Sequence, residues 1–447
     1  MAVAGGSGTR AWVEQVEKSL DKASVPSVAA SRRSIYRVPA CIKDGDPNRK
    51  VYKPRAVSLG PFHHGDPELA PMEEHKQRAL RHLLRRANQR PRLLPELVAS
   101  VEEVAEELES AYYPDLGDWW RGEEGRERFL EMMVVDGCFL LEVMRAADLH
   151  AKIAGDDYAP DDPVFSHHGV LYMVPYIRRD MLMLENQVPL LLLQKLVAVE
   201  TAKPPNSDVI NRMVLRFMSP SPRPPPSDTL GLHALDLHRR NMLYGYHPAP
   251  PHWSSSRDEP GPDDIIIIRS ALELYEAGIR FKKSHSKASL HDIRFRHGVL
   301  SMPSLTVDDS TKYMFANTMA FERLHVGAGN DVTAYVFFMG GIVKSAKDVA
   351  VLSSSGIIQN AAGSDEAAAK MFAIVSKDVV LEPESALEAV QREVNAYCDK
   401  PWNKWRASVI HNYFRSPTSV LNFLAAVVVL VVIAVQTAYT IMAFYYN

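Results

Sequence analysis

The sequence predicts a mainly α-helical protein with a small β-hairpin element and one C-terminal transmembrane helix. Three observations lead to this fold class: a helical period of apolar residues over most of the chain, a hairpin pattern near residues 291–307, and an uncharged apolar C-terminal run. The length of 447 residues and a 46% hydrophobic content are typical of a globular protein with a large core or two domains. The formal net charge of −3 argues against a nucleic-acid-binding surface, so we expect no nucleic-acid partner.

The N-terminal part divides into a mobile segment and a helical region. Residues 1–33 are rich in Gly, Ser and Ala, and we expect them to be mobile. Residues 34–218 have a helical period and form the helical N-terminal half of the main domain. One apolar helical face is predicted from residues spaced at i, i+3, i+4, i+7 and i+11, namely Val101, Val104, Ala105, Leu108 and Tyr112.

Two segments of this half are apolar nearly all round, and we expect them to be the central core helices. They are Phe129 to Ala147 and Ile177 to Val199. Pro189 lies inside the second segment and has no N–H to donate to the carbonyl of Glu185, so a kink is predicted there. The side chains of Asn186 and Gln187 can satisfy the backbone groups that the kink frees.

The C-terminal part begins after a Pro-rich and Ser-rich insertion or linker, residues 219–263. Residues 264–415 form the C-terminal half. Within it, the run HDIRFRHGVLSMPSLTVDDS predicts a β-hairpin at about 291–307 that turns at His297 and Gly298, and Pro303 implies a strand end or edge. Further helices are expected over Ser310 to Leu324, Asp331 to Lys344 and Glu384 to Tyr397.

The last 32 residues contain no Asp, Glu, Lys, Arg or His, and residues 418–445 are predicted to be a transmembrane anchor. The run VLNFLAAVVVLVVIAVQTAYTIMAF, from Val420 to Phe444, is long enough to span a lipid bilayer, since about 20 apolar residues suffice. The alternative is a fully buried core helix, but such helices are usually shorter than this run.

Charges near the anchor predict its orientation. Lys400, Lys404, Arg406 and Arg415 precede the span and no charge follows it, so residues 1 to about 415 should face the cytosol. We therefore expect a tail-anchored, single-pass protein of the plasma membrane or an endomembrane. The side chains expected at the membrane interface are Trp402, Trp405, Arg406, Tyr413, Phe414, Arg415, Tyr445 and Tyr446.

Polar residues that interrupt apolar segments are the candidate site. The cluster consists of His63, His64, Asp136, Asp180, Glu185 and Asn186. A buried carboxylate needs a partner, which for Asp136 could be Arg178, Arg179 or a capped helix end. We expect a structural polar network rather than catalysis, because paired metal-binding carboxylates in helical bundles use a Glu-x-x-His spacing that neither helix carries.

The adjacent histidines of VSLGPFHHG lie in a predicted turn. His63 and His64 could bind a metal or act as a base, but neighbouring residues rarely point at one metal, and Asp66 is the only carboxylate at ligand spacing. We expect imidazoles that hydrogen-bond to the backbone. We predict no catalytic, cofactor-binding or metal-binding residue and no cofactor.

The basic run HKQRALRHLLRRANQR, residues 75–90, could bind RNA or anionic lipid. Glu residues follow it closely over 96–109, so we expect a solvated pair of helices in which the acidic helix neutralises the basic one. Enzyme motifs are absent: the sequence has no GxxxxGK[ST], GxSxG, HExxH or CxxC pair. The three cysteines, Cys41, Cys138 and Cys398, lie far apart, as suits a reducing cytosol.

Several motifs in order resemble the plant family named domain of unknown function 247. They include IYRVP at 35–39, VSLGPFHHG at 57–65, MEEHK at 72–76, MMVVDGCFLLE at 132–142, DMLMLENQVP at 180–189 and REVNAYC at 392–398. The resemblance covers nearly the whole chain from Ser34. It implies a plant protein of unknown activity with one C-terminal span, and some grass members of the family are implicated in pollen–stigma self-incompatibility, which implies recognition rather than catalysis.

These observations lead to one hypothesis and two alternatives. The leading hypothesis is a membrane-anchored protein-recognition or signalling module with a protein partner. The first alternative is an unrecognised hydrolase or metal-dependent enzyme, which requires the polar cluster to line one cleft. The second is a scaffold on an anionic lipid surface.

Overall fold

The computed structural model divides the chain into two compact units. It describes residues 12–14, 16–18, 33–43, 50–86, 92–114, 116–148, 158–219, 229–244, 268–284, 289–377, 379, 386–413 and 417–446. Most of the predicted mobile segment and most of the predicted insertion lie outside these ranges. Unit 1 comprises Met1–Ala40, Tyr52–His238 and Arg323–Gly327, and unit 2 comprises Cys41–Val51, Arg239–Glu322 and Ala328–Asn447.

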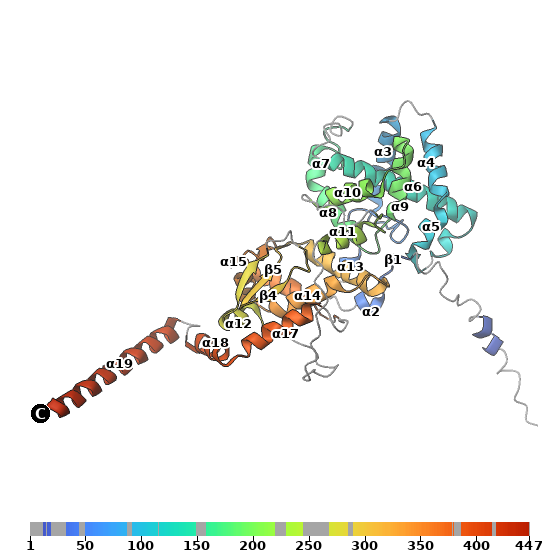
Figure 1. The fold of residues 1–447 in the computed structure, drawn as a ribbon. Helices are drawn as coiled ribbons and strands as arrows, with labels where there is room; N and C mark the ends of the chain where they lie inside the picture. Colours follow the sequence, from blue (N-terminus) through green and yellow to red (C-terminus); the bar gives the residue numbers. More distant parts are fainter. Residues whose placement is uncertain are drawn as a thin grey trace, which may run out of the picture. The chain divides into compact units, whose positions relative to one another are not determined.

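Unit 1 is helical (Figure 1). Its helices are α3 (Ala70–Arg86), α4 (Leu93–Glu102), α5 (Ala105–Ser110), α6 (Gly122–Ala147), α7 (His167–Tyr172), α8 (Val174–Asp180), α9 (Leu190–Thr201), α10 (Ser207–Met218) and the first half of α11 (Ala234–Leu243). A 3-10 turn, η3 (Asp118–Trp120), precedes α6, and the short strands β1 (Ile35–Tyr36) and β2 (Tyr112–Tyr113) pair in parallel.

Helix α6 is the centre of the unit 1 core. Its residues from Phe129 to Met144 are nearly all buried, and α3, α4, α9 and α10 pack against it. Gly137 allows α9 to approach closely, because a Cβ at this position would overlap the side chain of Leu196. The prediction that residues 129–147 form a central core helix is confirmed.

The second predicted core helix, residues 177–199, is wrong as a single kinked helix. Helix α8 ends at Asp180 and α9 begins at Leu190, and the segment between them is irregular. Pro189 immediately precedes α9, where its missing N–H costs nothing. The side-chain amide of Gln187 donates to the carbonyl of Met181 at 2.6 Å and of Met183 at 2.7 Å, which helps hold the irregular backbone.

The predicted helix over residues 101–112 is also interrupted. Helix α4 ends at Glu102, α5 covers Ala105–Ser110, and Tyr112 belongs to β2. All five residues of the predicted apolar face are nevertheless buried. The helical spacing of apolar residues thus predicted their burial correctly. It did not predict the break between α4 and α5 at residues 103–104.

Unit 2 combines helices with two small sheets. Its helices are α2 (Ala40–Lys43), α12 (Ala271–Glu276), α13 (Thr311–Leu324), α14 (Asp331–Ile342), α15 (Ala346–Ser354), α16 (Asp365–Val375), α17 (Ala386–Cys398), α18 (Pro401–Tyr413) and α19 (Pro417–Tyr446), together with the 3-10 turn η2 (Lys50–Tyr52). Its strands are β3 (Arg280–Lys283), β4 (Arg294–Arg296), β5 (Val299–Met302), β6 (Leu305–Val307) and β7 (Ile358–Asn360). The apolar helix α14 lies in its core, against α16 and α17.

The predicted hairpin is confirmed. Strands β4 and β5 pair antiparallel, and His297 and Gly298 connect them with φ values of 49° and 75°. Positive φ at both turn residues is the geometry that suits the twist of a two-residue hairpin. Two features were not predicted: β3, which pairs in parallel with β5 and completes a sheet of order β3-β5-β4, and the parallel pair β6-β7.

Helix α19 is the C-terminal apolar helix. The segment Leu424–Met442 is long enough and apolar enough to cross a membrane, and none of it is buried. Within the described ranges it is the one helix that meets these criteria. At 1.5 Å per residue its 30 residues extend about 45 Å, which exceeds the roughly 30 Å hydrocarbon core.

Candidate functional site

The predicted polar cluster surrounds an irregular segment of unit 1, residues 55–63, which we call the strap. Asp136 comes from α6, Asp180 ends α8, and Glu185 and Asn186 lie between α8 and α9. The strap itself contributes His63. His64 is exposed instead, and its ring lies 5.5 Å from that of Trp120.

Asp180 holds the start of the strap. Its Oδ2 accepts hydrogen bonds from three consecutive backbone N–H groups, those of Arg55 at 2.9 Å, Ala56 at 2.6 Å and Val57 at 3.1 Å. The guanidinium of Arg179 lies 3.2 Å from Oδ1. Burial raises the pKa of Asp180, while the three amides and Arg179 oppose this rise by stabilising the carboxylate.

Asp136 holds the middle of the strap. Its Oδ2 accepts from the backbone N–H of Gly60 at 2.8 Å, and its Oδ1 lies 2.7 Å from Nζ of Lys76, which is fully buried. Lys76 also donates to Oγ of Ser58 at 2.9 Å and pairs with Glu73 at 2.7 Å. Burial raises the pKa of Asp136, and the nearby ammonium opposes the rise.

The predicted partner of Asp136 is therefore wrong. Arg179 pairs with Asp180, and Arg178 lies over the ring of Phe217 at 5.0 Å. The actual partner, Lys76, comes from α3 because α3 packs along α6. A signal for it was present in the sequence: Met72, Lys76, Ala79 and Leu83 fall at i, i+4, i+7 and i+11, and all four are buried on one helical face.

Glu185 and Asn186 hold the rest of the strap and the segment that follows β1. Oε1 of Glu185 accepts from the N–H of Val38 at 2.7 Å, and its Oε2 lies 3.5 Å from Nε2 of His63. Asn186 accepts from the N–H of Leu59 at 2.8 Å and donates to the carbonyl of Val57 at 3.0 Å. A side-chain amide supplies both a donor and an acceptor, so it can bond the strap much as a β-strand would.

Gly60 is required where the strap passes closest to its surroundings. It has φ of 73°, and a Cβ there would lie 2.6 Å from the carbonyl oxygen of Gln187 and 2.8 Å from the hydroxyl of Tyr112. That hydroxyl donates to the same carbonyl at 3.0 Å. Gly65 differs, because it also has positive φ but nothing lies near its missing Cβ.

The cluster thus captures backbone amides rather than lining a cleft. Buried N–H groups outside regular secondary structure need partners, and here the carboxylates supply them. The cavity beside the strap has a volume of about 10 Å³ and is lined by Leu59, Asn186 and Gln187 among others, with room for about one water. Over the described ranges no group of three His, Cys, Asp or Glu residues is placed to hold a metal.

The basic helix α3 does not form the predicted solvated pair with the acidic segment that follows it. Lys76 is buried, Arg78 lies 3.1 Å from Asp162, and Arg86 lies 2.8 Å from Glu142 of α6. Helix α4, which begins the segment that follows α3, packs against α6 and α9 instead. Buried carboxylates elsewhere in unit 1 therefore neutralise part of this basic helix.

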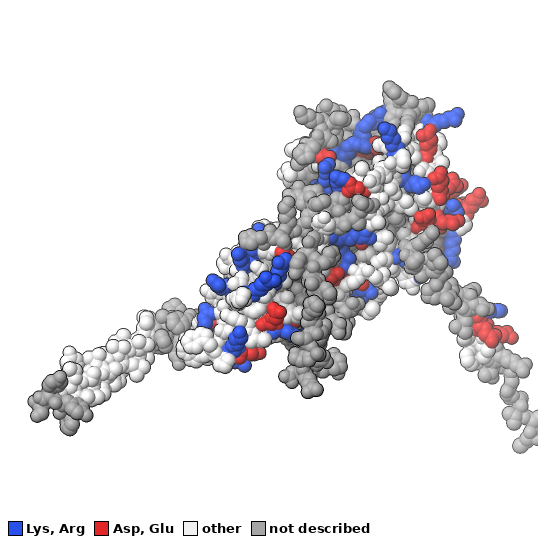
Figure 2. Space-filling view, viewed as in Figure 1, with Lys and Arg blue, Asp and Glu red and all other residues white. Residues whose placement is uncertain are grey.

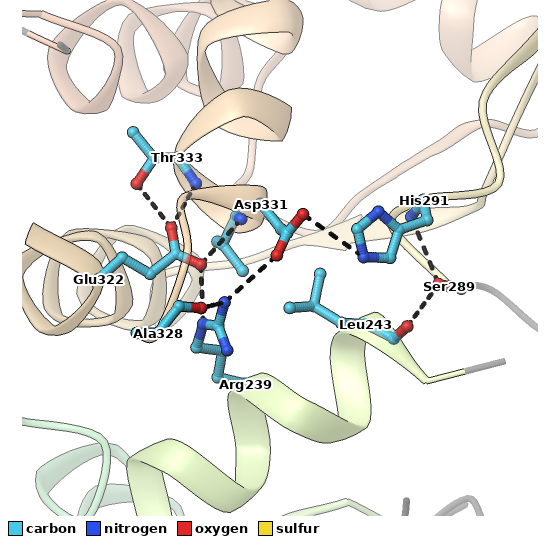
Figure 3. A network of polar contacts seen from close by, with 9 residues as sticks. Arg239, Leu243, Ser289, His291, Glu322, Ala328, Asp331 and Thr333 are labelled. Atoms are coloured by element: carbon cyan, nitrogen blue, oxygen red, sulfur yellow. Dashed lines mark hydrogen bonds and ion pairs between the residues drawn. The ribbon is translucent and has the colours of Figure 1, made fainter. Parts of the chain in front are cut away.

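Unit 2 holds a second buried network, which was not predicted from the sequence (Figure 3). Nε of Arg239 lies 2.7 Å from Oε1 of Glu322, and Arg239 also donates to the carbonyl of Ala328. Glu322 accepts from the N–H groups of Val332 at 3.0 Å and Thr333 at 2.8 Å, so it satisfies free amides at the start of α14. Burial raises the pKa of Glu322, and Arg239 opposes this rise.

The predicted membrane-interface residues are partly described. Trp402 and Trp405 on α18 are 70% and 57% exposed, and their rings lie 4.9 Å apart. Arg406 on the same helix lies against Gly278. Tyr413 ends α18, Tyr445 and Tyr446 end α19, and Phe414 and Arg415 lie outside the described residues.

Comparisons with known proteins identify the family. Residues 35–432 match a family described as plant protein of unknown function, DUF247. The chain is 30% identical to UPF0481 protein At3g47200 of Arabidopsis thaliana, over 92% of this chain and 86% of that protein. It is 22% identical to putative UPF0481 protein At3g02645 of the same plant, over 95% and 93% of the two chains. No solved structure matches. With a family match over most of its length, the chain belongs to the plant family DUF247.

Proposed function

We propose that the chain is a membrane-anchored recognition or signalling module, with the region before α19 facing the cytosol and binding another protein. The observation that carries the proposal is the exposure of α19. This stretch of 19 mostly apolar residues is not buried, unlike a typical core helix, and soluble monomers rarely expose apolar patches above a few hundred Å². A bilayer accounts for this surface, and the basic residues before the span favour a cytosolic N-terminal region.

Exposed apolar and aromatic side chains on unit 1 support a protein partner. Leu171 and Tyr172 on α7 are 60% and 58% exposed, and Tyr176 on α8 is 52% exposed. The guanidinium of Arg179 lies 5.3 Å from the Tyr176 ring. Tyr and Arg are over-represented among residues that dominate binding energy at protein interfaces. The carboxylates that bond the strap support this function indirectly, because their hydrogen bonds hold the backbone of residues 55–60 in place.

The topology is tested by protease protection of the full chain, tagged at each end, in sealed plant membrane vesicles with the cytosolic side outward. We expect loss of the N-terminal tag and protection of a C-terminal tag, until detergent opens the vesicles. Protection of the N-terminal tag would reverse the orientation. Release of the whole chain by alkaline carbonate would remove the anchor from the proposal.

The protein partner is tested by proximity labelling with the full chain in plant membranes. We expect a reproducible set of labelled proteins that is lost with Tyr172→Ser/Tyr176→Ser and kept with Val326→Ser, a 96% exposed apolar position elsewhere in unit 1. If the full chain labels only what α19 fused to the labelling enzyme labels, the recognition function is refuted. If the aromatic variant labels the same set as the unchanged chain, the partner binds elsewhere.

A further inference from the structure

The sheet β3-β5-β4 of unit 2 has one buried and one outer face. Leu300 and Met302 of the central strand are fully buried, whereas Val299 and Ser301 are partly exposed. Successive residues of a strand point to opposite faces, and residues paired across strands share a face. The outer face is therefore the one that carries Val299 and Ser301.

The strand register places four cations on this outer face. Val299 pairs with Arg280 of β3 on one side and Arg296 of β4 on the other. Ser301 pairs in the same way with Lys282 and Arg294. The cations of β3 and of β4 thus lie on either side of the small side chains of β5. Cations on the two outer strands are about 10 Å apart across the sheet, and the two cations on each strand are about 7 Å apart. In Figure 2, Lys and Arg side chains gather over the region where Figure 1 draws β4 and β5.

Most of this positive charge is not neutralised. Arg294 pairs with Asp292 at 2.9 Å, but Arg280, Lys282 and Arg296 have no ion-pair partner among the described residues. All three side chains are exposed. Neighbouring like charges on a sheet face disfavour folding, so the arrangement gains nothing for stability and suits a multivalent anion.

The sheet adjoins the helices that lead to the anchor. Tyr397 of α17 packs against Phe295 of β4 with ring centroids 5.4 Å apart. Arg406 of α18 lies against Gly278, two residues before β3. Helix α18 is also where Trp402 and Trp405 are exposed, and amphipathic indole rings favour the membrane interface.

We propose that this basic sheet face, formed by Arg280, Lys282, Arg294 and Arg296, binds the anionic lipid headgroups of the bilayer that α19 spans. The inference rests on the membrane anchoring proposed above. Anionic lipids of the cytosolic leaflet attract basic residues near a span, and the anchor supplies them at high effective concentration. Arg280 also lines an open surface hollow beside β3, together with Ser354 and Ser355 of α15.

Lysine acylation of the full chain in lipid nanodiscs, read by mass spectrometry, tests the proposal. Discs of phosphatidylcholine alone are compared with discs that contain about a quarter phosphatidylserine. We expect Lys282 of β3 to react more slowly in the anionic discs and to regain reactivity at about 0.5 M salt, which screens surface charges. The exposed Lys344, Lys370 and Lys377 are internal controls whose rates should not change.

Two variants of equal charge sharpen the test. Arg280→Gln/Arg296→Gln should lower the docking equilibrium about 25-fold, since each basic residue near an anionic surface contributes about fivefold. Lys344→Gln/Lys370→Gln removes the same charge from another part of unit 2 and should leave the protection of Lys282 unchanged. Equal loss in both variants would show a general charge effect and overturn the assigned face.

The remaining outcomes separate this inference from the proposed function. If the chain enters both kinds of disc and Lys282 reacts at the same rate in the two, the headgroup site is refuted and the anchor stands. If the chain enters neither kind of disc, both the membrane anchor and the headgroup site are refuted. Soluble inositol hexakisphosphate added to neutral discs is the second arm: protection equal to that of the anionic discs would assign the face to a soluble polyanion and overturn the bilayer assignment.

Discussion

Substitution of Lys76 by Met tests the buried ion pair that holds the strap. Met keeps most of the aliphatic length of Lys but carries no charge, so the packing of α3 against α6 changes little. Oδ1 of Asp136, 2.7 Å from Nζ in the native protein, loses its cation, and this carboxylate is 1% exposed. Removal of one partner from a buried pair costs about 3 to 5 kcal/mol, and we expect a loss of that size in the local free energy of unfolding of unit 1.

The cost should depend on pH in a defined direction. Burial raises the pKa of Asp136 in the folded protein, and Lys76 is the first of the groups that oppose the rise. Without Lys76 the folded state holds a proton at Asp136 to higher pH than the unfolded state does. The folded state then binds more protons, so stability falls as pH rises above about 4, by up to about 1.4 kcal/mol per pH unit. The Lys76→Met variant should therefore lie closer to the unchanged protein at pH 5 than at pH 8.

Hydrogen exchange of the full chain in detergent micelles, resolved to α3 and α6 peptides, measures this loss without unfolding α19. Lys195→Met is the matched control, because its Nζ lies 2.9 Å from Glu103 but the two side chains are 30% and 68% exposed. We expect the control to cost less than about 1 kcal/mol. Lys76→Met/Asp136→Asn should recover most of the loss, since an amide oxygen still accepts from Gly60.

Two results would refute the reasoning. A loss below about 1 kcal/mol for Lys76→Met would place this pair among surface ion pairs in strength. A loss that stays constant or grows as the pH falls from 8 to 5 would show that a proton on Asp136 does not relieve the missing cation.

Three further predictions concern the strap, the second network and the anchor. Gly60→Ala should destabilise unit 1 by about 2 to 4 kcal/mol, because the added Cβ clashes and the backbone is strained, whereas Gly65→Ala should cost about 1 kcal/mol. Hydrogen exchange of the α6 amides measures both losses. Equal losses would contradict the close contact of Gly60 with Gln187 and Tyr112. Glu322→Gln should cost unit 2 about 2 to 4 kcal/mol in α14 exchange, whereas Asp331→Asn, at a carboxylate 43% exposed, should cost less than about 1 kcal/mol; the reverse order would contradict the cap. Ile433→Lys in α19 should weaken insertion by about 3 kcal/mol and raise the carbonate-extractable fraction, while Ile433→Leu should not; an unchanged fraction would argue against a span.

The sequence by itself determined features that depend on short stretches of chain. The apolar C-terminal helix followed from length and missing charge, the burial of Phe129 to Met144 from composition, and the hairpin from His297 and Gly298 between alternating residues. Helices α13, α14 and α17 also follow their predicted ranges closely. In each case neighbours within a few turns of chain supply the signal, because helical and strand periods are local properties.

The tertiary structure decided which distant groups meet. Lys76 and Asp136 lie 60 positions apart, and only the packing of α3 against α6 brings them together. The same holds for β3, whose charged sequence gives no strand signal until it pairs with β5, and for the separation of α8 from α9. A buried charge or an irregular backbone is stable only where a specific partner satisfies it, and the partner's position is a property of the whole fold rather than of the local sequence.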